Sequence, residues 1–123
     1  MINLGKIIID TSSILFALSK KIDIFDSVRD ELEMKPLVSR GVLNELSRMS
    51  RGSSRKARDA KVALAMIKKH LIDVSPDNTY VDSWILSQAG SVSAICTNDT
   101  ELRKNLRSKG ATVYTLSEGG KFR

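Results

Sequence analysis

Short apolar runs alternate along the chain with longer segments in which apolar residues recur about once per helical turn. The clearest run, Ile7-Ile8-Ile9, is continuous and bounded by turn-forming residues, which is typical of a strand buried on both faces of a parallel sheet. Similar patterns predict strands at residues 35–38, 71–74, 93–96 and 112–116, and helices at 14–19, 24–34, 40–49, 55–70, 79–89 and 99–109. This alternation predicts a three-layer α/β/α fold with a central parallel sheet of about five strands.

Small polar residues indicate where several of these helices begin. One of residues 11–13, all with hydroxyl side chains, is expected to cap the first helix, and Ser39 and Thr79 are expected to cap two later ones. The final segment, residues 118–123, is basic, contains glycine and is expected to fray.

The composition is that of one ordinary globular domain. With 123 residues, 41% hydrophobic and 28% charged, the chain is long enough for one core, so a single domain over residues 1–123 is expected. No apolar stretch approaches the ~20 residues that span a bilayer. The first apolar run is followed at once by Asp10, unlike the layout of a secretion signal. These features predict a cytoplasmic protein with no membrane partner.

The chain has one cysteine and one histidine, which limits its chemistry. Cys96 lies in an apolar run and is expected to be a buried structural thiol. His70 ends a predicted helix, where an imidazole suits the negative end of the helix dipole. Cysteine nucleophiles, histidine acid–base catalysis and thiolate metal cages are therefore disfavoured.

Four acidic residues stand at the strand-to-helix junctions. Asp10 ends the first strand, Glu45 lies one to two turns into the helix after the second, Asp82 lies in the first turn of the helix after the third, and Asp99 directly follows the fourth. Parallel strands place their carboxyl ends at one edge of a sheet, so these carboxylates are expected to converge. Such a cluster of like charges is typical of a site for a hard cation with oxygen ligands, Mg²⁺ or Mn²⁺.

Each of these acids also has a simpler interpretation. Asp10 could serve only as the cap of the following helix, Asp82 and Asp99 lie where a carboxylate stabilises a helix dipole, and Glu45 fits a solvated helix face. The other acids, Glu101 among them, are expected on exposed faces or in turns. The joint pattern, rather than any single acid, favours a metal site.

The segments around the four acids resemble the four acidic motifs of PIN domains, in the same order. They are residues 7–12 (IIIDTS), 42–46 (VLNEL), 81–86 (VDSWIL) and 96–102 (CTNDTEL). The last of these is the most specific, because a basic helix, a glycine and a closing strand follow it. The resemblance extends over nearly the whole chain and implies a PIN-like fold.

The resemblance also implies hydrolysis of phosphodiester bonds in RNA. Asp10, Glu45, Asp82 and Asp99 match the catalytic ligands of one or two Mg²⁺ or Mn²⁺ ions, which activate water and neutralise the leaving oxygen. Thr11, Thr97 and Asn98 match small polar neighbours that orient water or phosphate. The chain has no cysteine and histidine set for the zinc ribbon of some ribosome-maturing members, so that subgroup is disfavoured.

A basic stretch, residues 48–61, begins one turn after Glu45, and the net charge of the chain is +6. Its members Arg48, Arg51, Arg55, Lys56 and Arg58 are expected to bind RNA phosphates beside the acidic cluster. The alternative is a solvated loop followed by the polar face of a helix. Phe16, Phe25 and Trp84 are expected in the core, so base stacking is expected to contribute little.

The sequence therefore predicts a metal-dependent endoribonuclease that acts on single-stranded or looped RNA, in RNA processing or maturation such as that of ribosomal RNA. A toxin ribonuclease of a toxin–antitoxin pair and a non-catalytic RNA-binding module are the alternatives. The basic end of the chain favours the RNA-processing role. A homodimer, an antitoxin and a ribosome-assembly partner are left open. A phosphotransfer domain with Asp10 as acceptor ranks last, because residues 10–12 hold no second acid.

Overall fold

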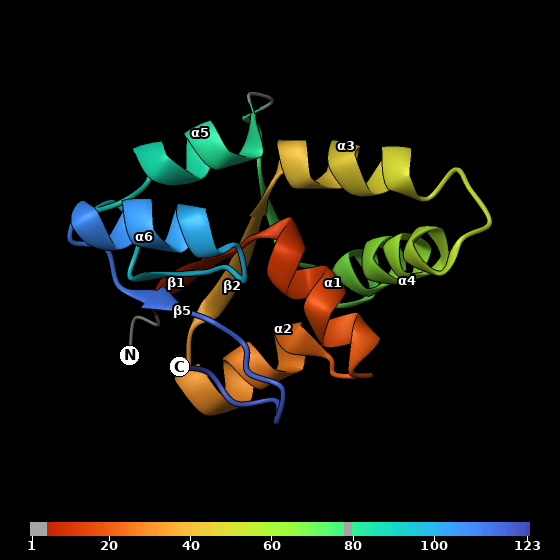
Figure 1. Ribbon diagram of the computed structural model, residues 1–123, viewed down its shortest axis with the longest axis horizontal. Helices are drawn as coiled ribbons and strands as arrows, with labels where there is room; N and C mark the ends of the chain where they lie inside the picture. The colour runs from red at the N-terminus through yellow and green to blue at the C-terminus, as the bar shows by residue number, and fades with distance from the viewer. Residues whose placement is uncertain (1–4, 78–79) are drawn as a thin grey trace.

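The computed structural model describes residues 5–77 and 80–123 (Figure 1). Its strands are β1 Lys6–Ile9, β2 Lys35–Ser39, β3 Asp73–Ser75, β4 Ala94–Cys96 and β5 Val113–Tyr114. Its helices are α1 Thr11–Ser19, α2 Ile24–Ser27, the π-helical turn η1 Val28–Leu32, α3 Arg40–Met49, α4 Arg55–Lys69, α5 Val81–Ser87 and α6 Thr100–Ser108. The predicted three-layer fold around a five-stranded parallel sheet is confirmed.

The order of the strands, β3-β2-β1-β4-β5, reverses direction at β1. β1 pairs with β2 through Ile8 and Leu37 and with β4 through Ile8 and Ile95. The chain builds β2 and β3 on one side of β1 and then returns to build β4 and β5 on the other. The carboxyl ends of β1 and β4 therefore flank the topological switch point, where open α/β sheets bind their ligands.

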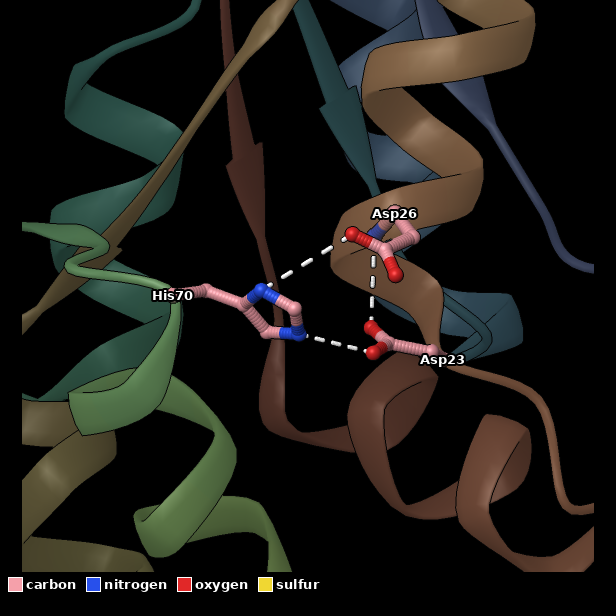
Figure 2. A group of neighbouring side chains, drawn as sticks. All are labelled: Asp23, Asp26 and His70. Atoms are coloured by element: carbon pink, nitrogen blue, oxygen red, sulfur yellow. Dashed lines mark hydrogen bonds and ion pairs between the residues drawn. The ribbon is translucent and has the colours of Figure 1, made fainter.

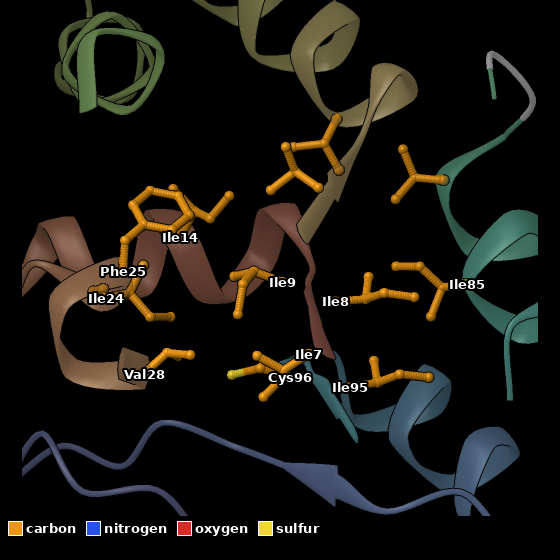
Figure 3. Packing of buried hydrophobic residues seen from close by; sticks show 14 of the residues in the cluster. Ile7, Ile8, Ile9, Ile14, Ile24, Phe25, Val28, Ile85, Ile95 and Cys96 are labelled. Atoms are coloured by element: carbon orange, nitrogen blue, oxygen red, sulfur yellow. The ribbon is translucent and has the colours of Figure 1, made fainter. Parts of the chain in front are cut away.

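β1 lies at the centre of the hydrophobic core. Its three isoleucines are 0% exposed. Figure 3 shows their alternation, with Ile8 pointing toward Ile85 of α5, and Ile7 and Ile9 pointing toward α1 and α2. Burying each such side chain contributes roughly 1.5–3 kcal/mol. The strand that leads into Asp10 is thus held firmly from both sides.

The helices form two groups. α1 packs against α3 and α4, and α5 packs against α6. Ser39 caps α3 as predicted, because its hydroxyl accepts a 3.1 Å hydrogen bond from the Val42 N–H. Thr79, the predicted cap of the helix at 79–89, lies outside the described residues. Among the helices of the described residues, none combines the length and apolar character needed to cross a bilayer.

α1 begins earlier than the sequence predicts. It starts at Thr11, with one residue between it and the end of β1, so Asp10 occupies the N-cap position and none of residues 11–13 is the cap. Thr11 and Ser13 are buried together with Ile14 and Ala17, so these small residues form the first turn of the helix and pack with it.

Two other predictions of secondary structure were wrong. The single helix at 24–34 is divided into α2 and η1, which ends where Glu33 adopts a left-handed backbone (φ 52°). The strand predicted at 71–74 begins at Asp73, because Leu71 ends α4 in a left-handed conformation (φ 52°) and is 84% exposed. The N–H groups of Leu71 and Ile72 bond back to the last turn of α4, in the Schellman arrangement that usually takes glycine.

The predicted frayed tail is instead folded onto the domain. Phe122 forms an antiparallel bridge with Leu116, and its ring meets that of Tyr114 edge-on at a centroid distance of 6.3 Å. Glu118 forms a 2.6 Å ion pair with Lys20, just beyond α1. The prediction failed because the apolar surface that Phe122 covers exists only in the folded domain.

Candidate active site

The four acids predicted from the sequence line one cleft, at the switch point of the sheet. Asp10 and Asp99 follow β1 and β4, while Glu45 projects from α3 and Asp82 from the first turn of α5. The cleft has a volume of about 250 Å³. It is lined by Asp10, Thr11, Ser12, Leu15, Glu45, Met49, Lys56, Val81, Asp82 and Asp99. The expected convergence of the four acids is therefore present in the structure.

Two hydroxyl groups hold the carboxylate of Asp10. Its Oδ2 accepts a 2.6 Å hydrogen bond from the Ser12 hydroxyl and a 2.8 Å bond from the Thr97 hydroxyl. Asp10 is 4% exposed and makes no side-chain cap bond to α1. The interpretation of Asp10 as only a helix cap is therefore wrong for its side chain. Both hydroxyl bonds fall on one carboxylate oxygen, so Oδ1 takes part in neither.

The same hydroxyls tie the end of β4 to α1. Ser12 accepts a 3.0 Å hydrogen bond from the Asn98 N–H, and Thr97 accepts a 3.1 Å bond from the Asp99 N–H. Neighbouring backbone and side chains therefore fix the relative position of Asp10 and Asp99. Ser12 was missed as a site residue, although its place two residues after a strand-ending aspartate was a signal.

Asn98 lies behind the cleft rather than in it. Its Oδ1 accepts hydrogen bonds from the Ser13 hydroxyl (2.7 Å) and the Leu116 N–H (3.2 Å), and its Nδ2 donates to the Leu116 carbonyl (2.9 Å). Neither Asn98 nor Thr97 lines the cleft. These contacts join α1, β4 and the segment after β5, and the expected role of Thr97 and Asn98 in orienting water or phosphate stays a prediction.

Asp99 both caps a helix and lines the cleft. Its Oδ1 accepts a 3.0 Å hydrogen bond from the Leu102 N–H and caps α6, while the residue also lines the cleft. α1, α5 and α6 all begin at the cleft, and the positive ends of their dipoles favour negative charge there.

Burial and the repulsion between neighbouring carboxylates raise the pKa of two of the acids. Burial, with a further contribution from the charge of Asp10, raises the pKa of Glu45 above 4.5, while Thr11 and Arg48 lower it. Burial also raises the pKa of Asp82, and the negative charges of Asp10, Asp99 and Glu101 add to the shift. A cation in the cleft would offset this repulsion. Glu101, expected only as a solvated residue, lines a hollow of about 250 Å³ shared with Asp82 and Asp99.

The lining of the cleft fits a hard divalent cation in its donor chemistry. Its charged ligands are carboxylate oxygens, which Mg²⁺ and Mn²⁺ prefer. Within residues 5–77 and 80–123, the Thr11 hydroxyl is the one buried side-chain oxygen or nitrogen that lacks a hydrogen-bond partner. It interacts with Glu45 short of full hydrogen-bond geometry, since it still lowers the pKa of that carboxyl.

A second group of metal-ligand type lies elsewhere in the molecule (Figure 2). In the part of the chain that the structure describes, Asp23, Asp26 and His70 form the one group of three such residues whose ligand atoms lie within 4.8 Å of one another. His70 Nε2 lies 2.7 Å from Asp23 Oδ2, and Nδ1 lies 3.7 Å from Asp26 Oδ1. No three of the four cleft acids, all of which lie within the described residues, have ligand atoms that close together. None of the three residues in Figure 2 lines the cleft.

Cys96 and His70 occupy the places that the sequence predicts. Cys96 is 0% exposed, and burial raises the pKa of its thiol to about 12, so it is a structural thiol. His70 is the C-cap residue of α4, and its ring joins that helix to the start of α2 through Asp23.

The basic stretch reaches the cleft through one residue. Lys56 lines the cleft, and Arg55 and Lys56 line a neighbouring hollow of about 620 Å³. Arg48 stands close enough to Glu45 to lower its pKa. Arg51 and Arg58 are exposed and line neither hollow. Among the described residues, none of these five cations forms an ion pair.

Two aromatic residues lie beside the cleft. Tyr80 is 86% exposed and lines a further hollow with Glu45 and Asp82. Phe25 and Trp84 are buried as predicted, but Phe16 is half-buried and lines the 620 Å³ hollow. The signal for Tyr80 was an aromatic residue in a polar loop just before the acidic helix. Phe16 was misjudged because its spacing matches the buried face of α1.

Comparisons with known proteins agree on the fold. A family model described as a PIN like domain matches residues 7–118. A solved structure of the PIN domain endonuclease Utp24 is similar over 96% of this chain and 89% of that one, with 25% identity and a TM-score of 0.77. A solved domain of a functionally unknown protein from Methanocaldococcus jannaschii DSM 2661 is similar over 92% of this chain and 91% of that one, with 16% identity and a TM-score of 0.60. This second likeness shows the fold alone. No curated protein matches. The family match and the endonuclease neighbour support a nuclease function.

Proposed function

Because the chain belongs to the PIN-like domain family, we propose that it is an endoribonuclease that hydrolyses phosphodiester bonds of single-stranded or looped RNA with Mg²⁺ or Mn²⁺. The observation that carries the proposal is the convergence of four carboxylates, from four separate strand-to-helix junctions, on one cleft. A scaffold that needed these acids only for helix capping would have no reason to place them together, because their repulsion costs stability.

Asp10, Glu45, Asp82 and Asp99 are the residues that would hold one or two ions. Such an ion, when bound, lowers the pKa of water and neutralises charge on the phosphate. Direct ligation by three of these carboxylates requires their side chains to move closer together than they stand, and a cation supplies the charge that makes this favourable.

The protein contributes orientation and substrate attraction. Ser12 and Thr97 hold one oxygen of Asp10, which fixes the direction of the carboxylate. Lys56, at the edge of the same cleft, attracts the phosphate backbone toward the acids. The acids repel that backbone, so binding and metal loading support each other.

Basic residues beside the cleft support a nucleic acid as the substrate. The described lining of the cleft holds no thiol or imidazole, which favours metal-assisted hydrolysis over cysteine or histidine catalysis. We assign the role to RNA processing, such as maturation of ribosomal RNA. If the protein were instead the toxin of a toxin–antitoxin pair, it would form a tight complex with a small antitoxin protein. A non-catalytic RNA-binding module would differ by binding without cleavage.

The test is a cleavage assay on a fluorescent RNA that contains both a single-stranded segment and a hairpin loop. Cleavage is expected with Mn²⁺ or Mg²⁺ and not with EDTA. Asp10→Asn should lower the rate roughly 100-fold or more, as removal of one positioned electrostatic group does. Asp26→Asn, a matched change outside the cleft, should leave the rate unchanged. Full activity in EDTA, or RNA binding without cleavage under any divalent ion, would overturn the proposal.

A further inference from the structure

A second hollow opens beside the acid cleft, between α1 and α4, which pack against each other (Figure 1). Its volume is about 620 Å³, within the range of small-molecule sites. It is lined by Ser12, Leu15, Phe16, Ser19, Lys20, Arg55, Lys56 and Asp59. Ser12, Leu15 and Lys56 line the acid cleft as well, so the two hollows are neighbours.

This hollow combines an apolar side with a cationic side. Leu15 and Phe16 are half-buried and present apolar surface from α1. Arg55 and Lys56 are exposed in the first turn of α4, where the helix dipole adds positive potential. Apolar surface beside paired cations is the chemistry that recognises a nucleotide, which has a flat base and a charged phosphate.

We propose that the hollow between α1 and α4 is a subsite for the nucleotide next to the scissile phosphate of single-stranded RNA. The base packs against Leu15 and Phe16, and the phosphate lies toward Arg55 and Lys56. The inference rests on the proposed function and adds to it the place where the neighbouring nucleotide binds.

The lining also orients the nucleotide. Asp59 lies one turn after Arg55 on α4, and its negative charge repels a phosphate. The phosphate is therefore expected near Arg55 and Lys56, at the start of α4. Lys20 is already engaged, since its Nζ pairs with Glu118 at 2.6 Å and stands 5.7 Å from the centre of the Phe16 ring. Arg55 and Lys56 form no ion pair within the described residues, so they are the cations of this hollow that remain available to the RNA backbone.

Phe16 lies close to the acid cleft along α1. Ser12 borders both hollows, and Phe16 lies four residues farther along α1. At 1.5 Å per residue, that is roughly 6 Å along the helix axis. A base held at Phe16 thus belongs to a nucleotide whose phosphate is at, or next to, the acid cleft.

The experiment measures affinity rather than cleavage. The Asp10→Asn protein, with Mn²⁺ present, is titrated with a seven-nucleotide RNA of mixed sequence and with seven versions that each lack one base. Loss of the base at one position should weaken binding roughly 5- to 100-fold, the range for one base packed on an aromatic side chain. In Phe16→Ala, the loss of affinity caused by removing that base should fall below about twofold. If Phe16→Ala fails to fold, Phe16→Leu should show the same result.

Two charge variants complete the test. Arg55→Ala should weaken binding of all eight RNAs and lower the slope of log affinity against log salt by roughly 0.7. Lys68→Ala, an exposed cation near the other end of α4, should change neither quantity. An equal penalty at every position, or a penalty that the Phe16 variants leave unchanged, would overturn the subsite while leaving the proposed function standing. RNA that is neither bound nor cut by the unmodified protein would overturn both.

Discussion

Neutralising Asp82 or Asp99 distinguishes between two interpretations of the acids, a metal site and a set of helix caps. Both residues line the acid cleft, but Asp99 also caps α6 through its 3.0 Å bond from the Leu102 N–H, whereas Tyr80 holds the cap position of α5. Asparagine at position 99 keeps an oxygen for the cap and removes the charge. Alanine at position 99 removes both.

The metal-free melting temperatures should follow from these contacts. Asp82→Asn and Asp99→Asn relieve repulsion and should melt at the temperature of the unmodified protein or above it. Asp99→Ala loses the cap, which costs about 1 kcal/mol, so it should melt roughly 3 to 6 °C below Asp99→Asn.

Added Mn²⁺ should then distinguish the variants further. At a free concentration 100 times the dissociation constant, binding stabilises the unmodified protein by about 2.7 kcal/mol, a rise of roughly 8 to 16 °C for a domain of this size. Asp82→Asn and Asp99→Asn should show a much smaller rise. Asp26→Asn, which alters the cluster of Figure 2 instead, should keep the full rise.

The assay is a thermal melt of each variant, in chelator and in millimolar Mn²⁺. The reasoning would be refuted by a rise that is the same in Asp82→Asn as in the unmodified protein. It would equally be refuted by a rise lost in Asp26→Asn, since the ion would then bind at Asp23, Asp26 and His70.

Three further predictions concern titration and RNA contacts. The pKa values of Glu45 and Asp82 are raised on folding, so the folded chain binds more protons there, and these two groups should add stability to the metal-free protein as the pH falls through their raised pKa values; urea unfolding should show a smaller gain in Glu45→Gln. Replacing Arg55 and Lys56 together by alanine should lower the salt slope of single-stranded RNA affinity by roughly 1.4, and an unchanged slope would mean that both are only solvated. Tyr80→Ala should weaken RNA binding roughly 5-fold or more in a fluorescence titration without altering the melting temperature, because the side chain is 86% exposed beside the cleft.

The parts of the fold that could be predicted are those specified by local pattern. The isoleucine run of β1 and the polar residues after it specify a buried strand and its carboxyl end, and the parallel alternation then brings the four acids to one edge. Capping by Ser39 was also predictable, because a hydroxyl before an apolar-periodic segment acts within a few residues. These features depend on neighbours in the sequence.

Most of the features that were missed depend on contacts between distant segments, and the end of α4 is a local exception. The tail is held by Phe122 against Leu116, and the carboxylate of Asp10 is held by Thr97, which lies 87 residues away in the chain. Leu71 adopts a conformation typical of glycine, which its own residue type disfavours and the end of α4 imposes. Phe16, which was expected in the core, is half-buried and lines the hollow between α1 and α4, so its surroundings also depend on a helix distant in the sequence.

The most direct test of the account is anomalous diffraction from crystals of the unmodified protein soaked in Mn²⁺. The account predicts one or two manganese peaks in the cleft, within coordination distance of carboxylate oxygens of Asp10, Glu45, Asp82 and Asp99. Manganese found at Asp23, Asp26 and His70 with an empty cleft, or at neither place at millimolar concentration, would contradict it.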